Sequence, residues 1–409
     1  MSRGLGDVYK RQPPYIDDTV ISEVVDSLRS GWITSGPKVK ALEEEIKLFS
    51  NAKEVLCVNS WTSGAIMMLR WLGVKAGDEV IVPAYTYSAT ALAVLHAGAK
   101  PVMVDSGTDF NISVDAIRKA ITPHTKAIIP VDIAGFPCDY DSIMRLVNLP
   151  EIREMFKAES PIQEKLERIL VMNDAAHSLG ACYSRNRRTG CETDIAIFSL
   201  HAVKNVTTAE GGAICLNLPI PFDNVELYKE LRMMSLNCQT KDAFSKSKVG
   251  GWRYDIVGLG MKINMADVNA AIGLAQIREY PVLLKERKRV FNTYSKAFAD
   301  CDWAIIPPSV DGEKESSYHI YALRIKDFTE EQRDHMIDEI AKAEVAVNVH
   351  FIPMPMLSFF KSLGYDIKNY PQAYENFKGE ISLPIYPQLG EEQLDFIINV
   401  VKTAYKTVT

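Results

Sequence analysis

The feature that most constrains the fold is an alternation of two residue patterns between about residues 50 and 285. Short apolar runs rich in β-branched residues alternate with segments whose apolar residues recur at helical spacing. The seven runs are EVLCVNS, DEVIVPAY, KPVMVDSG, TKAIIPVDIAG, RILVMNDAAH, DIAIFSLH and GGAICLNL. Strands that are apolar on both faces and separated by helices are typical of a parallel sheet covered on both sides. We therefore predict a large α/β domain with a mostly parallel, seven-stranded sheet between helices.

Two helices are expected before this alternation and a smaller domain after it. Apolar spacing predicts a helix over 19–29, ended by Gly31, and a second helix from Pro37 to Phe49. After residue 285, a long helix, the strand-like SYHIYALRI, a further helix, VNVHFIP and a terminal helix indicate a small α+β domain. The expected division is a tail or cloning remnant over 1–12, a large domain over 13–285 and a small C-terminal domain over 286–409. The charge-rich stretch 151–168 is expected to form a surface helical excursion.

Composition narrows the classes of partner. The 409 residues carry 46 Lys and Arg against 52 Asp and Glu, and the resulting net charge of −6 offers no field that would gather nucleic acid or an anionic membrane. No apolar stretch is long enough to span a bilayer and the N-terminus lacks a signal-peptide pattern, so we expect a cytoplasmic protein. The seven cysteines show no metal-binding spacing, so we expect reduced thiols and no metal.

Polar residues follow four of the predicted strands, at the carboxyl edge where open α/β sheets collect ligands. NSWTSG at 59–64 supplies hydroxyls and free N–H groups at a helix start, which suit an anion, although a plain helix cap is the alternative. VIVPAYTYSAT supplies Tyr87, which could hold a flat ring or simply pack.

The other two strand ends carry an acid and a lysine. Asp174, with His177 close behind, needs a partner at the end of a buried strand, either a helix N-terminus or a cationic ring nitrogen. Lys204 either reaches solvent from a loop or is a desolvated amine that acts as a nucleophile. Together, an anion cradle, an aromatic face, an acid and an amine are the groups needed to hold pyridoxal 5'-phosphate.

Seven motifs then carry a family resemblance over about residues 13–406. They are SGWITSGPKVKALE, DEVIVPAYTYSAT, ITPHTKAIIPVDIAG, NDAAHSLG, FSLHAVKNVTTAEGG, MKINMADVNAAI and ISLPIYPQL. The chain resembles the DegT/DnrJ/EryC1/StrS sugar aminotransferases, of fold type I of the pyridoxal-phosphate-dependent transferases. The resemblance implies amino transfer from an amino acid, expected to be L-glutamate, to a nucleotide-linked keto sugar. It also implies an amino sugar for surface polysaccharide or a related glycan as the product, and a homodimer with shared active sites.

The same resemblance assigns roles to individual residues. Lys204 would bond covalently to the cofactor and move a proton, and Asp174 would pair with its ring nitrogen. The other expected cofactor contacts are Thr62, Ser63, Tyr87, His177 and Ser199, with Asn264 reaching in from the neighbouring subunit. His350 would face the nucleotide sugar.

Three departures from the family pattern stand out. Trp61 occupies a position where a small residue is usual, Asn173 replaces a common acid, and the connection over 151–168 is longer than usual. None of them removes a group that the chemistry needs, although each could shape the choice of substrate.

Alternative functions remain open: another fold type I enzyme (lyase, racemase or aldolase), or a non-catalytic regulatory homologue. SGWITSGPK and VNVHFIPMP favour the sugar branch, and lysine at 204, where a related dehydratase has histidine, favours transfer over dehydration. The absence of GxGxxG after any predicted strand argues against a Rossmann dehydrogenase.

Overall fold

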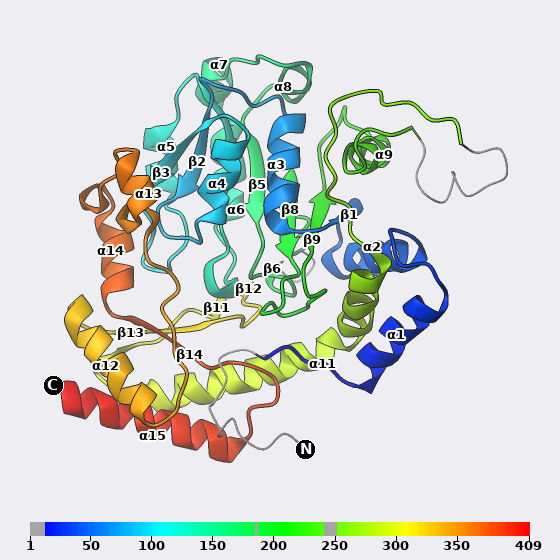
Figure 1. Ribbon diagram of the computed structural model, residues 1–409. Coiled ribbons are helices and arrows are strands. Elements are labelled where there is room, and N and C mark those ends of the chain that lie inside the picture. The colour runs from blue at the N-terminus through cyan, green and yellow to red at the C-terminus, as the bar shows by residue number, and fades with distance from the viewer. Residues whose placement is uncertain (1–12, 185–186, 241–251) are drawn as a thin grey trace.

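The computed structural model of the protein describes residues 13–184, 187–240 and 252–409, so the predicted tail over 1–12 lies outside the described residues. A seven-stranded sheet forms the centre of the larger part (Figure 1). Its strands run in the order β1 (Glu54–Val58), β9 (Gly212–Leu216), β8 (Ile195–Ser199), β5 (Leu170–Asp174), β4 (Thr125–Ile128), β2 (Glu79–Pro83) and β3 (Lys100–Val104). All seven predicted strands are confirmed. Neighbouring pairs from β8 to β3 are parallel, whereas β9 is antiparallel to both of its neighbours.

Helices cover both faces of this sheet, as the apolar character of both strand faces predicts. Along β1, Leu56 belongs to the core cluster that includes α3 (Trp61–Trp71) and α4 (Ala89–His96). The next residue, Cys57, belongs to the cluster on the other face, which includes residues of α2 and α11. Three further helices of this part are α5 (Val114–Ala120), α6 (Tyr140–Val147) and α9 (Asn224–Met234), with a short 3-10 turn η1 (Ile133–Gly135).

The two predicted N-terminal helices are confirmed as α1 (Asp18–Arg29) and α2 (Pro37–Ser50). Gly31 follows α1 at φ +72°, the left-handed conformation that glycine adopts easily at a helix end. The apolar stripe of α1 is only partly covered, however. Ile21 and Leu28 remain 52% and 55% exposed, although α1 packs against α11.

A second, antiparallel sheet carries the C-terminal part. It consists of β10 (Ala304–Ile305), β13 (Tyr321–Ile325) and β14 (Glu380–Leu383) and packs with α12 (Glu330–Lys342) and α15 (Glu391–Val408). Shorter elements complete this part: η2 (Met354–Met356), α13 (Ser358–Ser362), η3 (Ile367–Asn369) and α14 (Pro371–Lys378). The strand predicted in SYHIYALRI is thus present as β13.

One helix joins the two parts. In Figure 1, α11 (Asp267–Phe298) runs from the side of α1 and α2 to that of α12 and α15. Its residue Ile277 packs in the core beneath the large sheet, whereas Phe291 packs in the core of the small sheet. The predicted division between residues 285 and 286 therefore falls inside a continuous helix and stays a prediction.

The stretch 151–168 forms two short helices, α7 (Pro150–Met155) and α8 (Pro161–Leu166), at one edge of the molecule (Figure 1). Most of its charged side chains are exposed, whereas Arg168 is buried and paired with Asp194 at 2.6 Å. A small four-stranded sheet joins β11 (Val310–Asp311), β12 (Lys314–Glu315), β6 (Cys182–Ser184) and β7 (Arg187–Arg188). The cysteines are all free thiols. Within the described ranges, we find no helix long and apolar enough to cross a membrane and no cluster of three or more metal-ligating side chains.

Candidate active site

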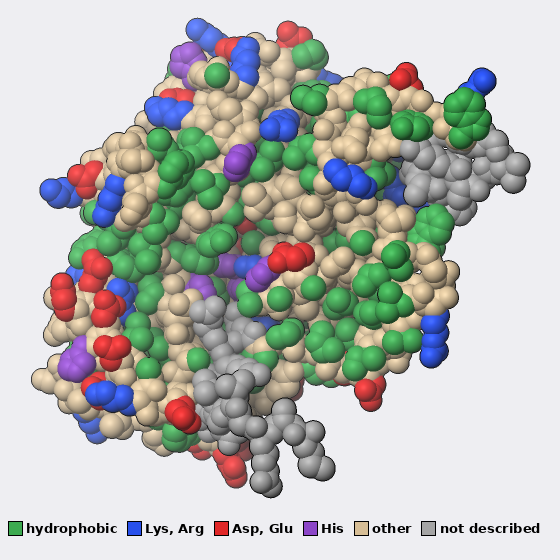
Figure 2. Space-filling model, in the orientation of Figure 1, with side chains coloured by type: hydrophobic (Ala, Val, Ile, Leu, Met, Phe, Trp, Pro, Cys, Tyr) green, Lys and Arg blue, Asp and Glu red, His purple; other side chains and the backbone are tan. Residues whose placement is uncertain are grey.

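A cavity of about 450 Å³ lies at the carboxyl ends of β5 and β8, facing the C-terminal part. Figure 2 shows histidine side chains and a basic side chain gathered in a hollow near the middle of the displayed face. Seven of the nine predicted site residues line the cavity: Thr62, Tyr87, Asp174, His177, Ser199, Lys204 and His350. Ser63 and Asn264 do not belong to its lining.

Asp174 is a buried acid with two hydrogen-bond donors. Thr90 Oγ1 donates to Asp174 Oδ2 at 2.8 Å, and the backbone N–H of Ala176 donates to Oδ1 at 3.2 Å. Burial raises the pKa of Asp174 to about 7, against the lowering effect of these two donors and of Lys204. A cation placed against this carboxylate would therefore stabilise its ionised form.

Lys204 lines the same cavity as Asp174. Burial of its amine lowers the pKa of Lys204 to about 8, while the charge of Asp174 acts in the opposite direction. An amine attacks a carbonyl carbon only in its neutral form, so this environment raises the fraction of nucleophilic amine near neutral pH.

The anion cradle expected at residues 59–64 forms the first turn of α3. Ser60 Oγ accepts from the backbone N–H of Ser63 at 3.1 Å, and Ser63 Oγ donates to Asn59 Oδ1 at 2.5 Å. These two serines therefore cap the helix, and the role of Ser63 as a phosphate ligand stays a prediction. Thr62 lines the cavity at the positive end of the helix dipole.

Glycine 212 allows β9 to approach this helix start closely. A Cβ atom at Gly212 would lie 2.7 Å from the backbone carbon of Ser60 and from the backbone nitrogen of Trp61. Cβ atoms essentially never make contacts this short, so any side chain here would push the first turn of α3 away. The small residues after Lys204 thus fix the shape of the expected anion site.

Aromatic rings form one side of the cavity. The ring of His177 stacks on Phe351 with centroids 5.8 Å apart and planes at 16°. His177 Nδ1 is buried and has no hydrogen-bond partner among the described residues. Buried polar atoms normally have a partner, so a bound ligand is expected to supply one here. Tyr87 is 62% exposed and lies 5.9 Å from the ring of Phe351.

Thr90 and His319 also line the cavity and were not predicted from the sequence. Thr90 belongs to a motif quoted for its tyrosines, and only its bond to Asp174 reveals it. His319 comes from the C-terminal part, and its ring lies 4.6 Å from that of His177. Burial lowers the pKa of His319 well below its usual value, so its ring is neutral.

Asn205, directly after Lys204, fixes the tautomer of His319. Its Nδ2 donates to Tyr280 OH at 2.9 Å and to Ser317 O at 2.9 Å, so its Oδ1 faces His319 Nδ1 at 2.8 Å as an acceptor. His319 therefore carries its proton on Nδ1. No feature of the sequence joins Asn205 to His319, since they are 114 residues apart.

His350 lies at the edge of the cavity nearest the small sheet. Its backbone N–H donates to Glu380 Oε2 at 2.8 Å, and its ring lies 2.8 Å from Ser382 Oγ. The predicted sugar-facing role of His350 is compatible with this place, and it stays a prediction.

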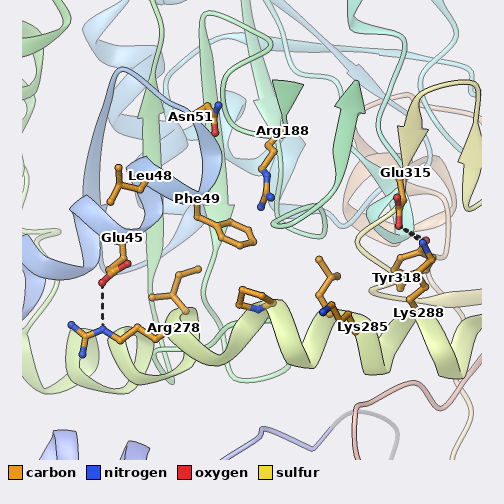
Figure 3. A pocket seen from close by; sticks show the side chains of 13 residues that line it. Glu45, Leu48, Phe49, Asn51, Arg188, Arg278, Lys285, Lys288, Glu315 and Tyr318 are labelled. Carbon is orange, nitrogen blue, oxygen red and sulfur yellow. Dashed lines mark hydrogen bonds and ion pairs between the residues drawn. The ribbon is translucent and has the colours of Figure 1, made fainter. Parts of the chain in front are cut away.

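A larger hollow of about 730 Å³ shares no lining residue with this cavity. It lies between α2, β7 and α11, and ion pairs join Arg278 to Glu45 and Lys288 to Glu315 across it (Figure 3). It contains none of the predicted site residues and no buried amine beside a buried acid. Its size alone therefore does not make it the candidate active site.

Comparison with known proteins decides the family. The sequence profile of the DegT/DnrJ/EryC1/StrS aminotransferase family matches residues 14–402. The chain belongs to this family. Its fold is that of the fold type I aminotransferases, and the family depends on pyridoxal 5'-phosphate.

Individual members of the family cover nearly the whole chain. The proposed sugar aminotransferase Spr1654 of Streptococcus pneumoniae, solved in its PMP form, is 43% identical with a TM-score of 0.94, covering 98% of this chain and 100% of that one. The same protein has also been solved in PLP and apo forms. The spore coat polysaccharide biosynthesis protein SpsC of Bacillus subtilis is 32% identical over 96% of both chains.

A third relative is PseC of Helicobacter pylori, an aminotransferase involved in the biosynthesis of pseudoaminic acid. It is 25% identical with a TM-score of 0.84, covering 97% of this chain and 99% of that one. The similarity of this chain to these relatives extends over both its larger part and its C-terminal part.

The side chains present fit the family's cofactor. Lys204 supplies an amine for its aldehyde, Asp174 a carboxylate for its ring nitrogen, and the start of α3 free N–H groups for its phosphate. The partnerless His177 Nδ1 and the close approach allowed by Gly212 also suit a bound group in this cavity. We find no feature of the lining that conflicts with such a cofactor.

Proposed function

We propose that the protein is a pyridoxal-phosphate-dependent aminotransferase that moves an amino group from L-glutamate to a nucleotide-linked keto sugar. The observation that carries this proposal is the joint placement of Lys204 and Asp174 in one cavity, each with a strongly shifted pKa. An amine and an acid that are both desolvated in one cavity are costly unless a ligand uses both groups. The family assignment then selects amino transfer among the reactions that such a pair supports.

When bound, pyridoxal phosphate supplies an aldehyde carbon and a ring that can accept an electron pair. Lys204 Nζ would hold the aldehyde and would serve as the base that accepts a proton from the α-carbon of the amino acid. Asp174 would keep the ring nitrogen protonated through its negative charge, and the bond from Thr90 would orient the carboxylate for this task. The N–H groups at the start of α3, with Thr62 and Ser199, hold the phosphate.

The sugar part of the proposal is supported by the relatives and by the polar rim of the cavity. Spr1654 and PseC are named for sugar or sugar-acid chemistry, and SpsC for polysaccharide biosynthesis. His350 and the exposed Tyr87 lie at the cavity and offer polar groups to a sugar. We propose surface polysaccharide or a related glycan, made in the cytoplasm, as the destination of the amino sugar.

We also propose a homodimer with shared active sites. Asn264 does not line the cavity of its own chain. Its Nδ2 instead donates to Ser35 Oγ at 2.7 Å. It follows a segment with large apolar side chains that are 52% to 91% exposed: Trp252, Tyr254, Ile256, Val257 and Leu259. Exposed apolar surface of this kind is typical of a protein–protein contact.

The test is a two-step reaction of the holoenzyme. L-glutamate should convert the cofactor to its amine form, seen as loss of the visible absorption band, and each nucleotide keto sugar of a panel is then added. The expected result is an aminated nucleotide sugar, identified by mass, with return of the band. An unchanged spectrum with glutamate would reject this donor, and a full panel without product would reject the substrate class.

Covalent attachment is checked separately. Borohydride reduction followed by peptide mapping should place the cofactor on Lys204, and Lys204→Ala protein should remain unlabelled. A label on another lysine would remove the basis of the proposed function. A lyase or aldolase would share this label, so only the amine-transfer assay distinguishes them.

A further inference from the structure

Behind Asp174, on the opposite face of β5, lies a buried polar network that the proposed reaction does not use. Asn173 and Asp174 are neighbours in the strand, so their side chains leave it on opposite faces. Asn173 Nδ2 donates to Asp132 Oδ2 at 3.1 Å and to Glu192 Oε1 at 2.7 Å. One amide group therefore joins two carboxylates, and Asn173 and Asp132 have no exposed surface.

Both carboxylates are otherwise held by hydrogen-bond donors only. Asp132 accepts from the backbone N–H of Cys138, from Tyr140 OH and from Ser178 Oγ, at 2.5 to 2.9 Å. Glu192 accepts from the backbone N–H groups of Gly190 and Cys191, at 2.7 and 2.9 Å. In the part of the chain that the structure describes, neither acid forms an ion pair with a lysine, arginine or histidine. By donating to both, the amide of Asn173 stabilises two buried acids that lie close to each other.

The same network forms hydrogen bonds to the turn that carries Asp174 and His177. Ser178 donates to Asp132, and the backbone N–H of Asp132 donates to Asp174 O at 3.2 Å. Residues 174–178 include both Asp174 and His177, so their positions depend on Asp132 and on the amide that keeps Glu192 beside it. We propose that Asn173 is a positioning residue: with Asp132 and Glu192 it holds the turn 174–178 and sets the negative charge behind Asp174.

The chemistry of position 173 explains why an amide is needed there. An aspartate would have the same shape, but it would bring a third carboxylate against two others and would donate nothing unless protonated. Position 173 is also one of the departures from the family pattern, because Asn173 replaces an acid that is common there. The structure supplies a reason, because Glu192 already occupies the space next to it with a carboxylate.

The charges involved act on one another. Burial, and next the charge of Asp132, raise the pKa of Glu192 to about 7, and Asp132 contributes to raising the pKa of Asp174. The other titratable groups facing this network are Cys138, Tyr140, Cys191 and Cys215, whose pKa values are all raised, and Lys204 beyond Asp174. Burial also raises the pKa of Asp132, and the pKa values of Glu192, Asp174 and Lys204 are about 7, 7 and 8.

The experiment compares Asn173→Asp, Glu192→Gln and the double variant, which exchanges the amide and one acid. Glu43→Gln is the matched control, because Glu43 is another buried acid whose pKa burial raises to about 7, held by Cys57 N–H and Tyr228 OH away from β5. Two quantities are measured. One is the melting temperature of cofactor-free protein from pH 5.5 to 8, and the other is the pH midpoint of the visible band of the holoenzyme.

Asn173→Asp should melt several degrees below wild type at pH 8, with a smaller deficit at pH 5.5 where the added acid is protonated. The double variant should recover most of this loss. The band midpoint should rise in Asn173→Asp and fall in Glu192→Gln, because the midpoint follows the negative charge behind Asp174, and stay at the wild-type value in Glu43→Gln.

Two results would overturn the inference: additive losses in the double variant, or equal midpoint shifts in Glu192→Gln and Glu43→Gln. The midpoint rests on the proposed role of Asp174, whereas the melting of cofactor-free protein does not. Failure of the proposed function would instead appear as borohydride labelling away from Lys204.

Discussion

The pKa of Lys204 gives a sharp test, because it predicts how the amine reacts before any cofactor is present. With a pKa of about 8, roughly 9% of Lys204 is neutral at pH 7, against about 0.03% at the ordinary value of 10.5. The neutral, reactive form is therefore about 300-fold more abundant. Asp174 opposes this lowering with its negative charge, so Asp174→Asn should move the pKa of Lys204 below about 8.

The assay is pH-dependent labelling of cofactor-free protein. A brief pulse of an amine-selective aldehyde with borohydride is followed by peptide mapping, and the peptide that carries the exposed Lys119 is the internal reference. Labelling of Lys204 in wild type should rise with a midpoint near pH 8. In Asp174→Asn the midpoint should lie lower, with the difference clearest above pH 7, where Asp174 in wild type is ionised.

The reasoning is refuted by a wild-type midpoint at or above pH 10. It is also refuted if Asp174→Asn raises the midpoint, since that would mean that the acid does not face the amine. Circular dichroism of both proteins separates such a result from a failure to fold.

Four further outcomes are expected. Thr90→Val removes the donor that lowers the pKa of Asp174, so the alkaline side of the pH–rate profile should be kept while turnover at pH 7 falls by about tenfold; an unchanged profile would contradict the assigned bond. Gly212→Ala places a Cβ 2.7 Å from the α3 backbone, so it should cost about 1–3 kcal/mol of unfolding free energy and weaken cofactor binding in an equilibrium titration; wild-type affinity would show that the helix start is not the cradle. Mixing Lys204→Ala with Asn264→Ala, each inactive alone, should restore part of the activity in hybrid dimers, and no recovery at all speaks against shared sites. Burial raises the pKa of Glu380 to about 8, so its contribution to stability is present at low pH and is lost as pH rises through 8; the melting temperature of Glu380→Gln should therefore fall less than that of wild type between pH 5 and 8, and parallel curves would disprove this.

The large sheet could be predicted because its strands leave a strong local signal. A strand covered on both faces is apolar throughout, and each of the seven runs is bounded by residues that favour turns or caps. The apolar stripe of α1 was equally visible, but its partner was not. Periodicity says which face of a helix is apolar and does not say what covers it, and Ile21 and Leu28 remain about half exposed.

The residues of the candidate site that lie at or just after strand ends could be predicted from the sequence. Asp174 and Lys204 follow strands that pair in parallel, so the topology alone brings them to one edge. Thr90 and His319 could not be found in this way. Thr90 is identified by a single bond, and His319 enters the cavity from another part of the chain, so both depend on packing that no local pattern records.

The sequence also could not predict which hydroxyl groups at the start of α3 cap the helix and which face the cavity. Ser60, Thr62 and Ser63 belong to one motif, yet Ser60 caps the helix while also lining the cavity, Thr62 lines the cavity, and Ser63 is not part of the lining. The choice between capping and ligand binding is made by side-chain rotamers, which the order of residues does not fix.

The single helix α11 has a mechanical consequence for how substrates reach the reacting groups. Residues of this 32-residue helix pack in both cores, so α11 joins the two sheets without a loop, and it bends most easily at Pro281, where one backbone hydrogen bond is missing. We therefore expect that little ordering free energy is spent on closing the cavity around the proposed nucleotide-sugar substrate.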